Sequence, residues 1–315
     1  MCEDYQPNPC RALKDELEQL SWLNRAMFER LFDGRVATSE WISHAFDRTD
    51  PASDECSAER HSDLRIDGDF FLIKQVDPYV YIIVGDATGH HAYAGGLKVF
   101  IAAAVQRIFD SLAKAPPPEP GTIVELLQDV FSVVGGARAG EVASEARGGA
   151  NIAVVRIATT GEHSMSYASA GLPIYALAKG RKTTKLGEFN DLKGVRFPFS
   201  NDVVAPSIVS SDGPQAQDCA FLAIFSDGFR DLARQRPGQG APTNEFFRAK
   251  SVLDVLEATV ARENGEQVVS AHTLVEAVIA AAREFRKGCL VPEFGDDDRL
   301  IVVIDLTRLC SLTRT

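Results

Sequence analysis

The strongest constraint on the fold comes from two apolar runs bounded by aspartates. DFFLIKQ begins at Asp69, YVYIIVGD ends at Asp86, and Asp77-Pro78 lies between them. Both runs are rich in β-branched and aromatic residues, which favour strands, and Asp-Pro favours a turn. A hairpin that folds back between residues 77 and 78 makes Asp69 and Asp86 cross-strand neighbours. Like charges facing each other destabilise a sheet, so the pairing indicates a bound cation.

Two further acidic sites have the same placement at strand ends. Asp227 follows FLAIF, and Asp296–Asp298 come just before LIVVI. In an antiparallel sheet the end of one strand lies beside the start of its neighbour, so we expect these carboxylates to share one rim with Asp69 and Asp86. Oxygen-only ligands favour magnesium, manganese or calcium. Two such ions could clamp a phosphate ester and acidify the attacking water.

Glycines lie beside these acidic positions. Gly89 follows Asp86 in GDATGHHA, and Gly228 directly follows Asp227 in FSDGFRD. Glycine lets the backbone approach an ion or a phosphate closely. We expect a helix to begin just after Gly89, with its positive end facing the phosphate site.

The order of the remaining elements indicates the fold class. Helices are expected over 92–113 and 121–134 and in SVLDVLEATVAREN and SAHTLVEAVIAAAREFRKG, and strands in NIAVVRIA, MSYASAG, PIYALAKG, CAFLAIFSDG and LIVVIDL. This order is not a regular βαβ alternation. It predicts an α+β fold with antiparallel sheets and helices in pairs on the outside.

The N-terminal part of the chain has a different residue pattern from the rest. Residues 11–33 form a predicted helix with a short heptad seam from Leu13 to Leu31, interrupted by Asn24. Such a seam favours either a homodimer through this helix or packing against its own domain, and both interpretations stay open. Residues 47–63 are polar and predict a linker, and no strand is expected upstream of residue 64. We therefore expect a helical regulatory or dimerisation segment over 1–60 and a second domain over 61–315.

Composition excludes several classes of function. The net charge of −11 argues against a nucleic-acid binder and an anionic membrane surface. No apolar run is long enough to span a membrane, and the polar start MCEDYQPNPC is no secretory signal. Six cysteines without CxxC spacing indicate reduced thiols in a cytoplasmic protein.

These motifs together resemble a known family. GDATGHHA resembles the GDxSGHG signature of the metal-dependent Ser/Thr protein phosphatases of the PPM type, the type 2C phosphatases, with the bacterial SpoIIE-like branch closest. DGDFF is similar to its GGDFY element, ASAGLPIY to AGHPPPL, FSDGFRD to YTDGLTE, and GDDDRLIVVI to DDxTLLVL. The five matches come in the family's order and cover about residues 64 to 306.

The resemblance implies an antiparallel β-sandwich flanked by paired α-helices, preceded here by the N-terminal helical extension. It also implies two divalent metal ions, Mn²⁺ or Mg²⁺, and hydrolysis of phosphoserine or phosphothreonine by a water that bridges them. By motif position, Asp86 would bridge both metals, the Ala87 carbonyl would bind one, and Asp227 would bind a metal.

The other positions follow from the same motifs. Asp297 would be the last metal ligand, with Asp296 the alternative if the register slips by one. Asp69 would hold metal-bound water or bind more weakly. His90 matches the family histidine, which acts at the site or makes a structural hydrogen bond.

Three positions depart from the family pattern. His91 replaces the second glycine of GHG, Leu300 stands where threonine is usual, and Leu172 replaces the histidine of AGHP. With Gly89 and Gly228, His91 is a candidate for contact with the substrate. The departures leave an alternative open, a catalytically weak phosphatase-fold module that binds a phosphoprotein partner as a regulatory scaffold.

The family suggests a substrate, and the order of elements along the chain suggests a control element. The substrate would be a phosphorylated bacterial signalling protein, with a STAS-type anti-sigma-factor antagonist the leading candidate. The helices predicted over 92–113 and 121–134 follow the Asp86 motif directly. We expect their packing to control whether the Asp86 loop completes the metal site.

Overall fold

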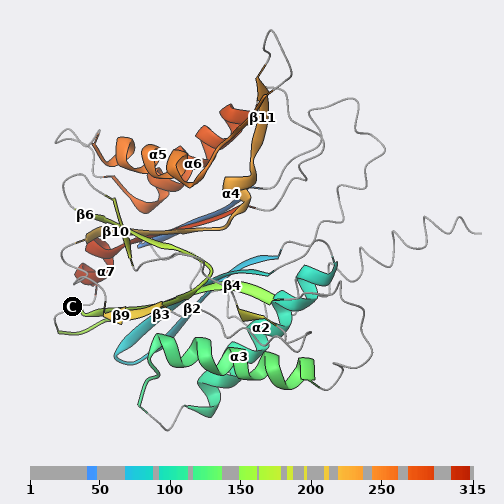
Figure 1. Ribbon diagram of the computed structural model, residues 1–315. Helices are drawn as coiled ribbons and strands as arrows, with labels where there is room; N and C mark the ends of the chain where they lie inside the picture. The colour runs from blue at the N-terminus through green and yellow to red at the C-terminus, as the bar shows by residue number, and fades with distance from the viewer. Residues whose placement is uncertain are drawn as a thin grey trace, which may run out of the picture.

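The computed structural model describes thirteen segments of the chain. They are residues 41–47, 68–87, 92–112, 116–136, 149–161, 163–178, 183–186, 195–196, 209–212, 219–236, 243–261, 269–286 and 299–312. In them two antiparallel sheets lie face to face between two pairs of helices (Figure 1). The predicted α+β sandwich is confirmed. The helix predicted over 11–33 and nearly all of the predicted linker lie outside these segments.

The first sheet has the strand order β2-β3-β4-β5-β9, and β8 pairs with β4 beside this path. The strands are β2 (Asp69–Val76), β3 (Tyr79–Ala87), β4 (Gly149–Ala158), β5 (Met165–Ala170), β8 (Val195–Arg196) and β9 (Val209–Asp212). The predicted turn at Asp77-Pro78 joins β2 to β3.

The second sheet has the order β1-β13-β10-β6-β7. Its strands are β1 (Ile42–Asp47), β6 (Ile174–Ala178), β7 (Thr183–Leu186), β10 (Cys219–Phe225) and β13 (Arg299–Asp305). A two-stranded ribbon of β11 (Ala233–Arg236) and β12 (Thr243–Phe246) projects beyond it (Figure 1).

Two pairs of long helices cover the outer faces of the sheets. The long helices are α2 (Ala92–Ser111), α3 (Pro120–Gly136), α5 (Ala249–Ala261) and α6 (Ala271–Arg286). Two short helices, α4 (Gly228–Asp231) and α7 (Leu306–Leu312), follow β10 and β13. The first sheet is covered by α2 and α3 and the second by α5 and α6 (Figure 1). No helix among the described residues is both long and apolar enough to cross a membrane.

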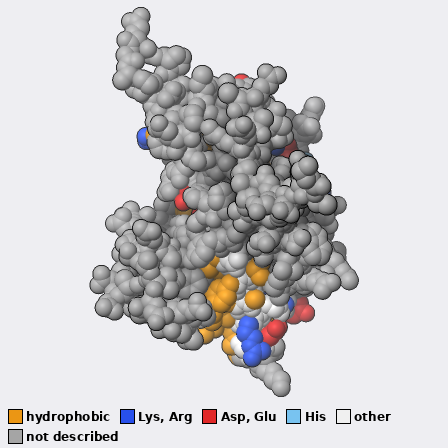
Figure 2. Space-filling view, turned by 90° about the vertical axis from the view of Figure 1, so that its right-hand side faces the viewer, with side chains coloured by type: hydrophobic (Ala, Val, Ile, Leu, Met, Phe, Trp, Pro, Cys, Tyr) orange, Lys and Arg blue, Asp and Glu red, His pale blue; other side chains and the backbone are white. Residues whose placement is uncertain are grey.

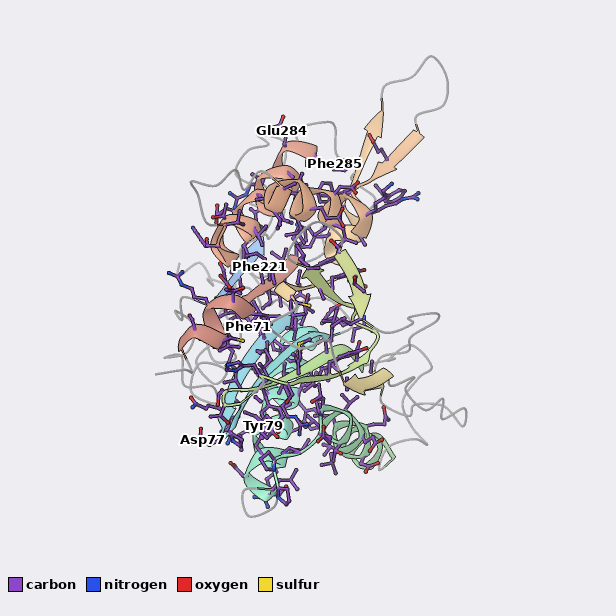
Figure 3. The ribbon with its side chains drawn as sticks, turned by 90° about the vertical axis from the view of Figure 1, so that its left-hand side faces the viewer. Phe71, Asp77, Tyr79, Phe221, Glu284 and Phe285 are labelled. Carbon is purple, nitrogen blue, oxygen red and sulfur yellow. The ribbon has the colours of Figure 1, made fainter. Side chains whose placement is uncertain are left out.

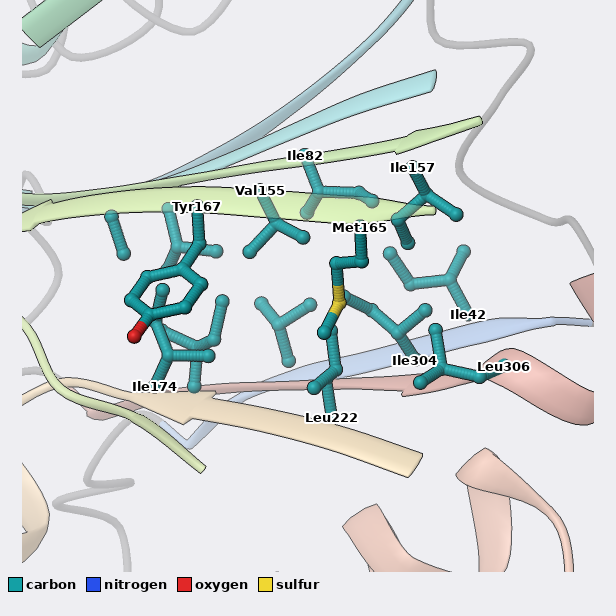
Figure 4. Packing of buried hydrophobic residues seen from close by; sticks show 14 of the residues in the cluster. Ile42, Ile82, Val155, Ile157, Met165, Tyr167, Ile174, Leu222, Ile304 and Leu306 are labelled. Carbon is teal, nitrogen blue, oxygen red and sulfur yellow. The ribbon is translucent and has the colours of Figure 1, made fainter. Parts of the chain in front are cut away.

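Side chains alternate between the two faces of each strand and so form three separate hydrophobic layers. Val80, Ile82 and Val84 of β3 lie in the cluster between the sheets, together with Leu222 and Ile304 of the second sheet (Figure 4). The intervening residues of β3 pack under α2 and α3. Both faces of each sheet are therefore covered, which explains why the central strands are almost continuously apolar.

The connection between α2 and α3 is tied to the first sheet. The Tyr81 hydroxyl donates a hydrogen bond to the Pro118 carbonyl at 2.7 Å, and burial raises the pKa of Tyr81 to about 12, so the hydroxyl stays protonated. Arg156 forms an ion pair with Glu119 at 2.6 Å and lies over the Tyr79 ring, near the hairpin tip (Figure 3). These contacts hold one end of the helical pair on the sheet.

The helical layer also leaves apolar side chains near the surface. Phe100 of α2 and Leu126 and Val130 of α3 are only partly buried. On the face turned to the viewer in Figure 2, hydrophobic side chains gather at the height that α2 and α3 occupy in Figure 1.

The expectation that no strand lies upstream of residue 64 is wrong. β1 pairs along its whole length with β13, from Ile42 opposite Ile304 to Asp47 opposite Arg299. Its residues lie on the N-terminal side of the boundary predicted at residue 60. The alternation that makes β1 an inward-facing strand brings the His44 ring to 4.2 Å from the ring of Phe71, between the two sheets (Figure 3).

The burial of His44 predicts an acid-sensitive fold. Loss of hydration lowers the pKa of His44 from its ordinary value of 6.5, so the folded chain favours the neutral ring. The unfolded chain takes up a proton near pH 6.5, so this contribution to stability is present above that pH and lost below it. We expect the urea midpoint to fall between pH 7.5 and 5.5, and to fall less in His44→Gln.

His272, exposed on α6, supplies the matched control. His272→Gln should keep the pH dependence of the unmodified chain. An identical acid response in all three proteins would contradict the assignment to His44.

Candidate metal centre

Asp69 and Asp86 lie directly opposite each other at the open end of the first hairpin. They are register partners in the β2–β3 pair, as the sequence predicts. The Ala87 amide donates to the Gly68 carbonyl at 3.2 Å and continues the pairing one step further. Two carboxylates are thus placed side by side where β2 begins and β3 ends.

Both carboxylates belong to the inner face of the sandwich. Asp69 alternates with Phe71 and Ile73, which pack against the cluster between the sheets. Asp86 alternates with Val84 in the same way. Asp69 is only 2% exposed, whereas Asp86 is half-buried. The carboxylates therefore occupy the positions where the hydrophobic filling of the sandwich ends.

Asp227 comes from the second sheet. It follows β10 and stands at the N-cap position of α4, with φ −75° and ψ −14°, and its side chain makes no capping hydrogen bond there. Gly228, the first residue of α4, is buried. Because Phe225 is paired with Ile301, the chain around Asp227 lies beside the start of β13, as predicted for a shared rim.

Ser226 joins the rims of the two sheets. Its hydroxyl donates to Oδ2 of Asp69 at 2.8 Å and accepts from the Leu300 amide at 3.0 Å. The Ser226 amide in turn donates to the Leu300 carbonyl at 2.9 Å. The starts of β2 and β13 and the end of β10 are therefore connected through one buried side chain.

Asn151 extends the row of Asp69 and Asp86 onto β4. It is the register partner of Asp86 and is half-buried. Gly171 lies against it with φ +86°, and a Cβ at Gly171 would come within 2.2 Å of Asn151 Oδ1. Only glycine suits both the backbone conformation and this close approach, which explains the glycine in ASAGLP.

The described carboxylate and backbone oxygens are chemically suited to a hard divalent cation. They make up only part of the ligand set predicted from the sequence. Carboxylate and backbone oxygens are the ligands that Mg²⁺ and Mn²⁺ prefer. Among the residues described, no three His, Cys, Asp or Glu side chains lie close enough to hold an ion. Asp296 and Asp297, the remaining acidic candidates, lie outside those residues, as do Gly89, His90 and His91.

Two of the departures from the family pattern are explained by packing. Leu172 and Leu300 are both buried in the hydrophobic cluster between the sheets. Their side chains fill the sandwich, so these departures remove no ligand from the described rim.

Comparison with solved structures identifies the fold. The SiaA-PP2C domain of Pseudomonas aeruginosa is similar with a TM-score of 0.64 at 16% identity, over 94% of this chain and 97% of that one. A mutant bacterial serine phosphatase gives 0.54 at 11% identity, over 85% and 99%. A C. elegans sex determining protein gives 0.54 at 13% identity, over 87% and 68%. No family model and no curated protein matches the sequence.

The chain therefore has the fold of the PP2C-type phosphatase domains, over nearly all of its length. This confirms, at the level of the fold, the resemblance to PPM phosphatases drawn from the five motifs. The roles of the individual site residues stay predictions.

Sequence reasoning missed Ser226 and Asn151. Ser226 immediately precedes Asp227 in FSDG, and Asn151 immediately precedes the apolar run IAVVRIA. A polar residue next to the end of a buried strand is a weak signal, because such residues also occur in ordinary turns. Their importance depends on partners more than 60 residues away, Asp69 for Ser226 and Asp86 for Asn151.

Gly171 gives a test of this packed rim. We expect Gly171→Ala to destabilise the fold by more than Gly161→Ala. Gly161 also has positive φ, +74°, but faces open space, so it reports the backbone cost alone, about 1 kcal/mol. The excess at Gly171 measures the collision with Asn151.

Urea unfolding of both variants and of the Asn151→Ala/Gly171→Ala double variant checks this. The double variant should recover the additional stability that Gly171→Ala loses relative to Gly161→Ala. Equal losses at Gly161 and Gly171 would show that Asn151 does not contact Gly171 as described.

Proposed function

We propose that this chain is a metal-dependent phosphatase that removes phosphate from phosphoserine or phosphothreonine in a protein. The observation that carries the proposal is the Asp69–Asp86 pair on the inner face of a PP2C-type sandwich, with Asp227 two residues after β10 of the facing sheet. Two facing carboxylates in a partly buried site require positive charge nearby. A hard cation bound by these carboxylates, together with ligands from outside the described residues, would supply it.

The chain's own residues have distinct tasks in this proposal. Asp86 and Asp227, with the carbonyl of Ala87, would hold two Mn²⁺ or Mg²⁺ ions, completed by Asp297 or Asp296. When bound, these ions clamp the phosphate and lower the pKa of the attacking water. Asp69, buried and hydrogen-bonded, would orient water at the site.

The remaining candidates concern the substrate. His91, Gly89 and Gly228 would contact the phosphoprotein, and His90 would act at the site or support it. A phosphorylated bacterial signalling protein, in the first instance a STAS-type anti-sigma-factor antagonist, is the proposed substrate. The N-terminal segment would regulate the catalytic domain or dimerise it in the cytoplasm.

The alternative is a phosphatase fold that binds a phosphoprotein and turns it over weakly. It is motivated by His91, where the family signature has glycine. A histidine side chain at that position, five residues after Asp86 in the chain, would alter the access of the phosphate. Metal and phosphopeptide binding without hydrolysis would favour this function.

The first prediction for this site concerns its carboxylates. With Mn²⁺ or Mg²⁺ the purified chain should hydrolyse a phosphothreonine peptide, and a chelator should abolish the activity. Asp86→Asn and Asp227→Asn should each lower kcat/KM about 100-fold or more, because replacing a carboxylate by an amide removes charge from the ligands. Phosphate release measured against metal concentration checks this.

Asp77→Asn is the matched control, since Asp77 is exposed in the turn at the far end of the same hairpin (Figure 3). It should retain full activity. Activity that survives both site substitutions would refute the proposed centre.

The second prediction concerns α2, which begins five residues after Ala87. We propose that the packing of α2 and α3 on the sheet governs the Asp86 loop. Val105 of α2 and Val278 of α6 are both buried, under opposite faces of the sandwich. Val105→Ala and Val278→Ala should each cost about 2 kcal/mol of stability.

Only Val105→Ala should also weaken metal binding and lower turnover. Calorimetric Mn²⁺ titration, together with phosphate release, distinguishes the two. If both variants lose stability alone, α2 does not control the site.

A further inference from the structure

Ser226 occupies an unusual place in the β10–β13 ladder. In a hydrogen-bonded antiparallel pair, two opposite residues exchange both of their N–H···O bonds. The Ser226 amide makes its bond to the Leu300 carbonyl, but the return bond from the Leu300 amide goes to the Ser226 hydroxyl. The side chain has replaced the backbone acceptor at the last step of the ladder.

This replacement leaves the hydroxyl proton for the other sheet. A serine hydroxyl has one proton to donate, and it is directed to Oδ2 of Asp69 at 2.8 Å. Ser226 and Asp69 are each 2% exposed, so water does not compete for this bond. A hydrogen bond to an ionised carboxylate is stronger than one between neutral groups.

Three segments that carry candidate ligands meet at this one hydroxyl. Asp69 is its acceptor, Asp227 is the next residue in the chain, and Leu300 follows Asp296–Asp298 by two residues. The Ser226 hydroxyl therefore holds Oδ2 of Asp69 in place. It also fixes the distance between β2 and the start of β13.

We propose that Ser226 is a positioning residue of the metal centre, which holds the Asp69 carboxylate and the start of β13 in the geometry that binds the divalent cation. The inference rests on the proposed function, because it assigns Ser226 a task in that centre. Residues that orient metal ligands typically raise metal affinity by about 10–100-fold. We expect an effect of that size for Ser226.

The test is Mn²⁺ binding by the full chain, measured by calorimetry and independent of turnover. Ser226→Ala should raise the dissociation constant by about 10–100-fold. Ser226→Thr, which keeps the hydroxyl, should restore the affinity of the unmodified chain. If the Ala variant does not fold, Ser226→Cys fills the same space with a weak donor and should show the same direction of change.

Ser166 provides the matched control. It is also a buried strand serine, and its hydroxyl oxygen accepts from Arg156 Nε at 3.0 Å within the first sheet. Ser166→Ala should change stability without changing Mn²⁺ affinity. This control distinguishes positioning of the metal centre from a general loss of packing.

Each outcome is decisive. Unchanged affinity in Ser226→Ala overturns the positioning role and leaves the proposed function intact. Equal weakening in Ser166→Ala, or no recovery in Ser226→Thr, shows a merely structural serine and also overturns it. If the unmodified chain binds no Mn²⁺, both the positioning role and the proposed function are wrong.

Discussion

The facing carboxylates of Asp69 and Asp86 are the constraint on which the rest of the rim depends. They occupy inward positions of a sandwich whose other inward positions are filled by Val, Ile and Leu. Burial and mutual repulsion both disfavour two charges there, so the fold must compensate them. The hydrogen bond from Ser226 to Asp69 is one such compensation. A divalent cation bound between the two carboxylates would offset both charges directly, which is the physical reason to propose one at the rim.

Much of the fold could be predicted because its signals are local. The β2–β3 hairpin, the four long helices of the described segments and the central strands each carry their own apolar period and their own breakers. The pairing of Asp69 with Asp86 followed from the position of a single turn. β1 was missed although Ile42 and His44 alternate inward, because six residues with a histidine and an aspartate look polar in isolation. Its strand character depends on β13, which lies more than 250 residues later.

In the candidate site, too, some residues could be predicted from the sequence and others could not. Asp69, Asp86 and Asp227 stand at strand ends that the sequence marks plainly, and the structure places them at one rim. Ser226 and Asn151 could not be found from the sequence, since their partners are set by the register between distant strands and between sheets. Hydrogen-bond partners of ligands are in general less visible in sequence than the ligands, because many polar residue types can serve.

The position of β1 connects the N-terminal part of the chain to this rim. β1 is an edge strand, its last residue Asp47 lies opposite Arg299, and Arg299 directly follows Asp296–Asp298. Arg299 is itself 2% exposed, so β1 ends opposite a buried residue at the start of β13. A chain cut at residue 61 would lose this strand and would leave β13 as the exposed edge of the second sheet. The role of the N-terminal segment is therefore tested cleanly only by shortened chains that begin before residue 41 and keep β1 in place.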